Sequence, residues 1–270
     1  MNPSVHPHHR RHLRPAVRRV LTVTVVACIA VGGASFVLHS RSAVPAASAT
    51  STSSASAASE AESSLLTARQ AQAILDDPRM VLVNHTNKMP DDHTFTTKAC
   101  GSATAVNKTL QTVACNAFLE LQKAAAAENV TVWMQSGYRS VSYQTNLYEK
   151  KTNYYKQQGY DDAKAKEMAA AVVNPPGYSE HNCGLAADLN SPEHTGLDEG
   201  FENTAAFRWL CQHAGENGFI LRYPKGAEEK TEITYEPWHW RYVGVENAAK
   251  INASGLCFED YIAALQQIAG

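Results

Sequence analysis

The stretch YSEHNCGLAADLN, Tyr178 to Asn190, places a histidine and an aspartate seven residues apart, with small residues between them. Its second half has the length and apolar content of a short β-strand. Alternate residues of an extended chain point to opposite faces, so Asp188 points away from the leucines at 185 and 189. Gly184 permits a turn that brings His181 toward Asp188. An imidazole and a carboxylate are two suitable zinc ligands, although the same spacing also fits a simple turn that enters a strand.

The stretch YEPWHWRYVG, Tyr235 to Gly244, supplies the other candidate residues. His239 lies in a predicted strand, and Glu236 precedes it by three residues. Pro237 interrupts the alternation, so Glu236 need not point away from His239. A catalytic zinc takes three protein ligands and an open position for water, whose pKa it lowers to about 7. A free carboxylate can accept the proton of that water and pass it to a leaving amine, which suits metal-assisted hydrolysis.

The spacing alone leaves a simpler interpretation open for each residue. A histidine in an aromatic strand is more often a core or surface residue with satisfied hydrogen bonds than a metal ligand. Trp238 and Trp240 can wall a cleft or belong to the core. Cys183 is expected to pack, because nitrogen and oxygen ligands already complete the set.

The rest of the chain alternates between helical and extended patterns. Helical patterns occupy residues 67–76, 107–130, 143–166, 203–218 and 245–269. Extended patterns occupy residues 80–84, 130–137, 184–190, 219–224 and 238–244. Helices stand early and late, with short strands grouped between them. This order predicts an α+β fold in which helices flank a small, mainly antiparallel sheet that carries the zinc site.

The N-terminal region differs from the rest of the chain in charge and hydropathy. Six arginines and no acidic residue precede residue 42, which leaves 18 basic and 26 acidic residues, a net charge of −8, in residues 42–270. Such an acidic body argues against nucleic acid as a partner. Residues 20–38 carry no charge and span about 28 Å as a helix, close to the ~30 Å hydrocarbon core of a bilayer. The arginines before this run place the N-terminus in the cytoplasm and the body outside.

We therefore predict four segments: a cytoplasmic basic segment at 1–19, a transmembrane signal-anchor at 20–38, a Ser/Ala-rich linker at 39–64 and one folded domain at 65–270. The alternative is a secreted protein whose signal peptide is cleaved near the small residues at 47–49. Five cysteines lie outside the apolar run. An oxidising exterior permits disulfides, and the odd number leaves at least one cysteine unpaired.

Three blocks of the sequence resemble one enzyme family. SEHNCGLAAD resembles the S-x-H-x-x-G-x-A-x-D motif of zinc D-alanyl-D-alanine carboxypeptidases of the VanY type, which are related to L,D-carboxypeptidases and D,D-dipeptidases. EPWHWRYVG resembles their E-x-W-H motif, and SGYRS followed by Gln144 resembles their upstream substrate motif. The blocks occur in family order, and the resemblance covers roughly residues 80–265. Glu232 is a departure, because relatives tend to have glycine there.

The resemblance implies a zinc carboxypeptidase domain at 65–270. It implies that Zn²⁺ is held by His181, Asp188 and His239 and that Glu236 is the catalytic base. The upstream motif adds Arg139 and Gln144 as candidate substrate contacts, and Ser179 either contacts the substrate or only caps the turn. Arg139 has a planar, permanent charge that suits a peptide carboxylate or a developing oxyanion, whereas the alternative is a surface salt bridge.

The expected activity is removal of the terminal D-alanine from peptidoglycan stem peptides outside the membrane. An L,D-carboxypeptidase that acts on tetrapeptide stems would use the same zinc chemistry. The alternative from another class is a non-catalytic module that binds the cell wall.

Overall fold

The computed structural model describes residues 66–101 and 108–270, and the predicted segments at 1–19, 20–38 and 39–64 lie outside these residues. Within the described ranges, no helix combines the length and apolar character that a membrane crossing requires. The helices are α2 (Ala68–Leu75), α3 (Thr112–Ala127), α4 (Val141–Gln157), α5 (Asp162–Ala170), α6 (Ala205–His213), α7 (Glu228–Thr231), α8 (Val245–Ser254) and α9 (Phe258–Ala269). The strands are β1 (Thr97–Ala99), β2 (Thr109–Gln111), β3 (Trp133–Ser136), β4 (Ala186–Asn190), β5 (Phe219–Leu221) and β6 (His239–Tyr242). Short 3₁₀ helices are η1 (Pro78–Met80), η2 (Glu180–Cys183), η3 (Glu199–Asn203) and η4 (Ala214–Asn217).

The expected α+β fold with a small antiparallel sheet is confirmed. The main sheet has four strands in the order β3-β4-β6-β5, and every neighbouring pair is antiparallel. Ala187 pairs with Trp240, and Asp188 pairs with His239. Paired residues share a face, so the alternation predicted for β4 continues across β6.

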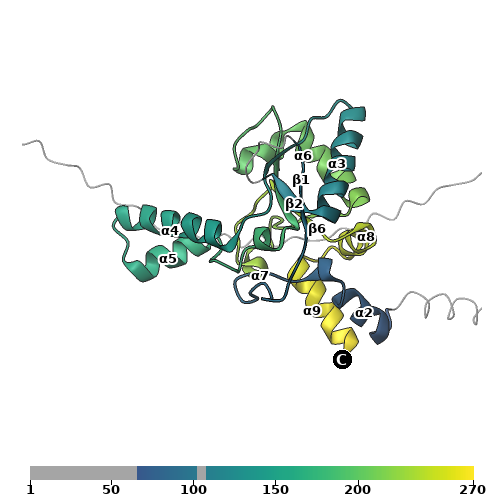
Figure 1. Ribbon diagram of the computed structural model, residues 1–270, viewed down its shortest axis with the longest axis horizontal. Coiled ribbons are helices and arrows are strands. Elements are labelled where there is room, and N and C mark those ends of the chain that lie inside the picture. The colour runs from purple at the N-terminus through teal and green to yellow at the C-terminus, as the bar shows by residue number, and fades with distance from the viewer. Residues whose placement is uncertain (1–65, 102–107) are drawn as a thin grey trace, which may run out of the picture. The chain divides into compact units, whose positions relative to one another are not determined.

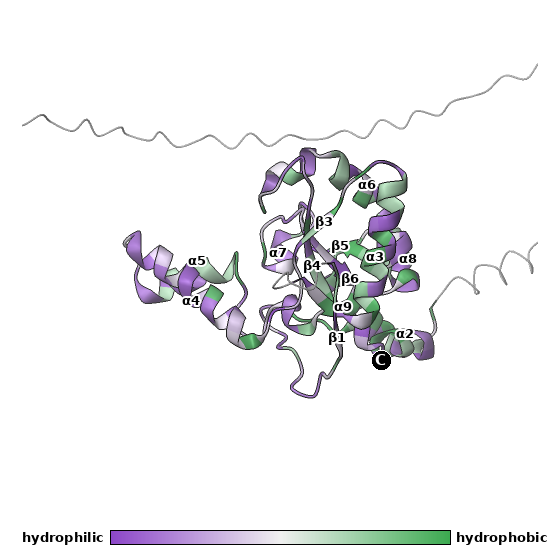
Figure 2. Cartoon of the chain, turned by 45° about the horizontal axis from the view of Figure 1, so that its top comes forward, coloured by the Kyte–Doolittle hydropathy of each residue, from purple (hydrophilic) through white to green (hydrophobic). Residues whose placement is uncertain are grey.

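The two faces of this sheet have different partners. Leu189, Trp240 and Tyr242 belong to a buried cluster with residues of α3 and α6, which cover one face (Figure 2). On the other face, Ile220 and Val243 join a second cluster formed with α2, α8 and α9. Helices α2 and α9 lie side by side (Figure 1). The second face also carries the polar side chains of β4 and β6, so the candidate site lies on the side opposite the larger apolar cluster.

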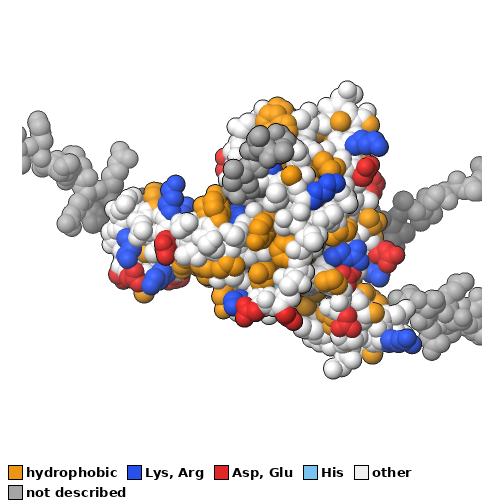
Figure 3. Space-filling model, in the orientation of Figure 1, with side chains coloured by type: hydrophobic (Ala, Val, Ile, Leu, Met, Phe, Trp, Pro, Cys, Tyr) orange, Lys and Arg blue, Asp and Glu red, His pale blue; other side chains and the backbone are white. Residues whose placement is uncertain are grey.

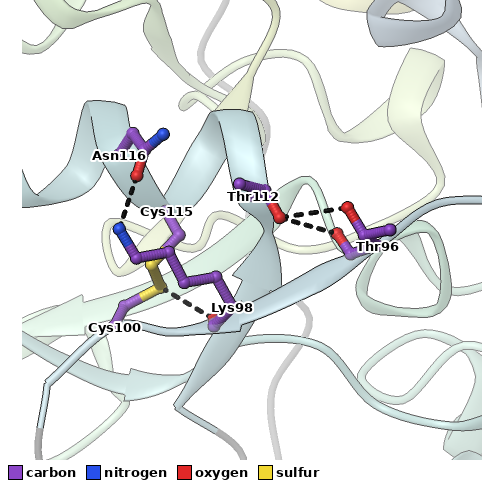
Figure 4. The surroundings of a disulfide bond; sticks show 6 residues. All are labelled: Thr96, Lys98, Cys100, Thr112, Cys115 and Asn116. Atoms are coloured by element: carbon purple, nitrogen blue, oxygen red, sulfur yellow. Dashed lines mark hydrogen bonds between the residues drawn. A yellow bond between two sulfur atoms is a disulfide. The ribbon is translucent and has the colours of Figure 1, made fainter.

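A disulfide ties the first hairpin to α3. Cys100 follows β1 and Cys115 lies in the first turn of α3, and their sulfur atoms are bonded (Figure 4). Lys98 Nζ donates to Asn116 Oδ1 at 2.7 Å across the same contact. The other cysteines of the described residues, Cys183, Cys211 and Cys257, are free thiols.

The extended pattern at 80–84 does not form a strand, and that prediction is wrong. Val83 is fully buried, which explains the apolar pattern. At Val81, however, the hydrogen-bond partner is a side chain and not a strand: Arg241 Nη2 donates to the Val81 carbonyl at 2.7 Å and to the neighbouring Arg79 carbonyl at 2.8 Å. Periodicity reports burial and not the identity of the hydrogen-bond partner.

Two predicted helices have different bounds in the structure. The helix expected over 107–130 begins only at Thr112, because residues 109–111 pair with β1. The helix expected over 143–166 is two helices, α4 and α5, and Asp161 caps the second by accepting from the Lys164 amide at 2.8 Å. These helices pack on each other as a hairpin with many Lys, Asp and Glu side chains on its visible surface (Figure 3).

Glu232, the departure noted in the sequence, adopts a left-handed conformation at the end of α7, with φ 57° and ψ 13°. This conformation costs a residue with a Cβ about 1–2 kcal/mol, and glycine adopts it freely. The carboxylate of Glu232 lies 3.7 Å from His85 Nδ1 and is half exposed, so losing that contact costs little.

We expect Glu232→Gly to raise the free energy of unfolding by roughly 0.5–1 kcal/mol, after the greater entropy of glycine in the unfolded chain is subtracted. Chemical denaturation measures the change. Glu232→Ala is the matched control, because it removes the carboxylate and keeps the Cβ. Equal stability of the Gly and Ala variants would contradict the prediction.

Candidate metal centre

Three side chains predicted as metal ligands meet at the polar face of the sheet. Asp188 of β4 and His239 of β6 are register partners, and His181 comes from η2, immediately before β4. One ligand atom from each of the three residues lies within 4.8 Å of the others, and all three side chains are buried. Gly184, with φ 69°, makes the left-handed turn between η2 and β4 that brings the two segments together.

The hydrogen bonds around these side chains leave one possible ligand atom of each residue facing a common point. Asp188 Oδ2 accepts from Arg139 Nη2 at 2.6 Å, whereas its buried Oδ1 has no hydrogen-bond partner. His181 Nδ1 donates to the carbonyl oxygen of Gly137 at 2.7 Å, and its Nε2 lies 3.3 Å from Asp188 Oδ1. His239 Nδ1 lies 3.3 Å from the same oxygen. A buried carboxylate oxygen without a donor, facing two imidazole nitrogens, is a donor set that suits a divalent cation such as zinc.

A tight turn places Glu236 beside this set. The His239 amide donates to the Glu236 carbonyl at 3.1 Å, and Pro237 occupies the second position of the turn, where proline is favoured. Glu236 Oε2 thereby lies 3.6 Å from His239 Nδ1, and its side chain is 12% exposed. Burial raises the pKa of Glu236 to about 8. The carboxyl group is thus suited to exchange a proton near neutral pH.

The ligand candidates titrate very differently. Burial, reinforced by the positive charge of Arg139, lowers the pKa of His181 to about 4. Burial also disfavours the charged form of His239, but the adjacent carboxylates of Asp188 and Glu180 outweigh it and raise its pKa to about 9. For Asp188, attraction to His181 and Arg139 overcomes burial and holds the pKa well below its usual range. At neutral pH Asp188 is ionised, His181 is neutral and His239 carries a proton.

A cleft of about 400 Å³ opens over these residues. The predicted substrate residues Arg139, Gln144 and Ser179 all line it, as does Trp238. Trp240, in contrast, is 2% exposed and belongs to the core. A larger groove of about 700 Å³ lies between α2 and α8, but it contains none of the candidate ligands.

Two of the substrate candidates are held in place by hydrogen bonds within the protein. Gln144 is fully buried, and its Nε2 donates to the Asn174 carbonyl at 2.7 Å, which leaves Oε1 without a partner. Arg139 is not part of a surface salt bridge, since its side chain is 16% exposed and its ion-pair partner is Asp188. Arg139 also donates from Nε to Ser136 Oγ at 3.0 Å.

Two groups of residues in this region are not predicted by the sequence motifs. Lys151 and Asn174 line the cleft from α4 and from the segment after α5. Glu180, between two residues that had been singled out, is 1% exposed and forms ion pairs with Arg222 and Arg241. An acidic residue inside a buried motif was the available signal, because a buried carboxylate requires a partner. Cys183 packs as expected, and its thiol donates to the Glu180 carbonyl at 2.8 Å.

The chain resembles known proteins along most of its length. A family model described as "VanY: D-alanyl-D-alanine carboxypeptidase" matches residues 107–245. A D-alanyl-D-alanine carboxypeptidase from Enterococcus faecalis is 31% identical over 265 residues, which are 94% of each chain. A crystal structure of the vancomycin resistance D,D-pentapeptidase VanY in complex with Zn(II) is 34% identical with a TM-score of 0.60, covering 69% of this chain and 99% of that one. The LD-carboxypeptidase LdcB has the same TM-score at 31% identity, over 70% of this chain and 88% of its own.

The titration of His239 generates a prediction about zinc affinity. A cation at the three ligand atoms must displace the proton of His239, which is present below pH 9 and lost above it. Affinity should therefore rise with pH by up to about tenfold per unit until about pH 9 and then level off. His181 adds no competing proton in this range, because its pKa is about 4. Competition with a chelator of known zinc affinity at each pH measures the effect, and a flat profile below pH 9 would contradict it.

Proposed function

The chain belongs to the VanY family of D-alanyl-D-alanine carboxypeptidases and is a zinc-dependent D,D-carboxypeptidase; from this premise we propose the residues that carry its reaction and the place where it acts. The alternative interpretation as a non-catalytic module that binds the cell wall is therefore wrong. The substrate is a peptidoglycan stem peptide that ends in D-alanine, and a VanY structure in complex with D-Ala-D-Ala supports this class of ligand.

The observation that carries the assignment is the convergence of His181, Asp188 and His239 within 4.8 Å, with a free carboxylate beside them. We propose that these three residues hold the zinc. When bound, zinc supplies Lewis-acid chemistry, which makes a water molecule acidic enough to act as a nucleophile near neutral pH. The open side of the ligand set faces the cleft, where a peptide bond can approach.

Glu236 is the proposed base. Its carboxylate accepts the proton of the attacking water and then donates it to the nitrogen of the departing D-alanine, which leaves as a neutral amine. The place of Glu236 in a tight turn next to His239 keeps it beside the ligands without a strong hydrogen bond of its own. Its pKa of about 8 allows both uptake and release of the proton.

Arg139, Gln144 and Ser179 are the proposed substrate contacts. Arg139 already donates to Asp188 and Ser136, and the rest of its guanidinium lies at the cleft. It can therefore meet an oxyanion close to the ligands, or a terminal carboxylate. The unpaired Oε1 of Gln144 can accept a hydrogen bond from a peptide N–H. Ser179 is 3% exposed and borders the same cleft.

The L,D-carboxypeptidase alternative keeps the same zinc chemistry and differs in the stereochemistry of the residue before the scissile bond. The likeness to LdcB, an LD-carboxypeptidase, is the observation that favours it. The match to the D,D family model and to the Enterococcus faecalis D-alanyl-D-alanine carboxypeptidase supports the D,D reaction.

The place of action is also a proposal. The uncharged run at 20–38 with arginines before it supports a single-pass anchor, with the domain outside the cytoplasm on a Ser/Ala-rich linker. The disulfide between Cys100 and Cys115 supports an oxidising compartment. Secretion after signal cleavage gives the same compartment without attachment.

Peptides of defined length test the reaction. We expect the purified full-length chain to convert a pentapeptide stem ending in D-Ala-D-Ala to the tetrapeptide, with little action on the tetrapeptide itself, as followed by mass spectrometry. Preferential loss of D-alanine from the tetrapeptide would establish the L,D alternative instead.

Glu236→Gln tests the base in the same assay. The variant keeps the shape of the side chain and removes the proton acceptor, so turnover should fall about 10²–10⁴-fold while zinc remains bound. Zinc content measured on the same sample separates loss of the base from loss of the metal. Near-normal turnover would show that another group transfers the proton.

Arg139→Lys distinguishes the two roles of Arg139. A contact made only in the transition state predicts a lower kcat with little change in KM, whereas a contact to the terminal carboxylate predicts mainly a higher KM. We expect the first result, because Arg139 is 2.6 Å from the proposed ligand Asp188. Full activity of both the Lys and Ala variants would remove Arg139 from the site.

Protease treatment of intact spheroplasts tests the topology. Exposure of the domain on a linker predicts release of a fragment that starts within residues 39–64. A secreted protein would be found in the medium before protease is added, and a protected domain would contradict an extracytoplasmic location.

A further inference from the structure

Glu180 is a buried carboxylate that the proposed reaction does not use. It lies in η2 next to His181 and is 1% exposed. Its Oε1 accepts from Arg222 Nε at 2.8 Å and from Arg241 Nη1 at 2.6 Å. Its other oxygen, Oε2, lies 3.4 Å from Nε2 of His239. The carboxylate therefore has one oxygen fixed by two guanidinium groups and the other directed at a proposed metal ligand.

The guanidinium groups are themselves held in place. Arg222 forms a two-pronged ion pair with Glu259 of α9, and Arg241 donates to two backbone carbonyls in the segment after α2. Glu180 and Glu259 balance the charges of Arg222 and Arg241, so this group of four is neutral. Such a balanced arrangement allows the carboxylate of Glu180 to stay ionised in the interior.

The position of Glu180 has a consequence for the proton of His239. A carboxylate fixed by two arginines can only accept hydrogen bonds, so Nε2 of His239 must be the donor. In the neutral ring Nδ1 then carries a lone pair, and Nδ1 is the nitrogen that lies 3.3 Å from the unpartnered Oδ1 of Asp188. The tautomer that Glu180 selects is the one in which His239 can serve as a ligand.

The other ligand candidates are fixed by different partners. His181 Nδ1 donates to the backbone carbonyl of Gly137, which no side-chain substitution removes. Asp188 is held by Arg139. Of the two candidate histidine ligands, His239 is therefore the one whose tautomer a side chain controls.

We propose that Glu180 is a positioning residue that keeps the ring proton of His239 on Nε2 and so presents Nδ1 to the zinc. The proposal rests on the ligand role of His239 in the proposed function. Carboxylate partners of this kind orient metal-binding imidazoles and raise their basicity. Glu180 itself touches neither substrate nor metal in this arrangement.

Glu180→Gln is the direct test. The amide oxygen of the glutamine would remain with the two arginine donors, which turns its NH₂ toward His239. Two donors cannot face each other, so the neutral ring would shift its proton to Nδ1, into the ligand position. We expect the zinc dissociation constant to rise about 10–100-fold, measured by chelator competition on the full-length chain in detergent.

Glu259→Gln is the matched control. It removes the same charge from the same group of four and also deprives Arg222 of a partner, but Glu259 has no contact with His239. Its zinc affinity should stay close to the wild-type value. Equal weakening in the two variants would overturn the proposal, because the effect would then belong to the charge balance.

His239→Ala separates this proposal from the function on which it rests. If His239→Ala binds zinc like the wild type, the ligand assignment fails. If His239→Ala loses zinc affinity while Glu180→Gln behaves like Glu259→Gln, only the positioning role fails.

A measurement on the unaltered chain covers the case in which Glu180→Gln does not fold. In the zinc-loaded protein with ¹⁵N-labelled histidine, imidazole NMR reports which nitrogen of His239 carries the proton. We expect a slowly exchanging proton on Nε2 and a metal-bound Nδ1. A proton on Nδ1, with Nε2 bound to the metal, would overturn the proposal without any substitution.

Discussion

The candidate centre depends on the antiparallel register that sets Asp188 opposite His239. A slip of one residue would turn Asp188 into the apolar cluster and Leu189 onto the polar face. Burying a leucine contributes about 1.5–3 kcal/mol, and burying an unpaired carboxylate costs several more. The apolar face of the sheet, packed on α3 and α6, therefore fixes the register. Asp188 and His239 lie opposite each other because a register shifted by one residue would remove the leucine from the apolar cluster and bury the carboxylate in it.

The polar face is a buried surface that carries a high density of charge. Arg139 pairs with Asp188, and Arg222 and Arg241 pair with Glu180, so these two buried carboxylates each have a fixed cationic partner. Removing one member of a buried ion pair typically lowers the free energy of unfolding by about 3–5 kcal/mol. The charged groups around the centre therefore contribute to the stability of the domain. Through Glu259, this arrangement also connects α9 to the site.

The helical patterns and most strands followed from periodicity, because burial of one face is a local property of the sequence. The errors occurred where the backbone partner comes from far away. Residues 80–84 have the apolar content of a strand, yet the carbonyl of Val81 binds the side chain of Arg241. Residues 109–111 continue the pattern of α3 but pair with β1. Neither the Arg241 side chain nor strand β1 can be recognised as a partner from the local sequence.

The sequence by itself determined the chemistry of the site. Two histidines, an aspartate and a glutamate in family order define the donor types, and Pro237 already indicated that Glu236 need not oppose His239. Tertiary structure decided which atom of each residue faces the common point. The hydrogen bonds of Glu180, which set that choice at His239, come from residues 42 to 61 positions away in the chain. The local sequence gives the type of each ligand. The partner that decides which ring nitrogen of His239 carries the proton comes from a distant segment that only the fold brings near.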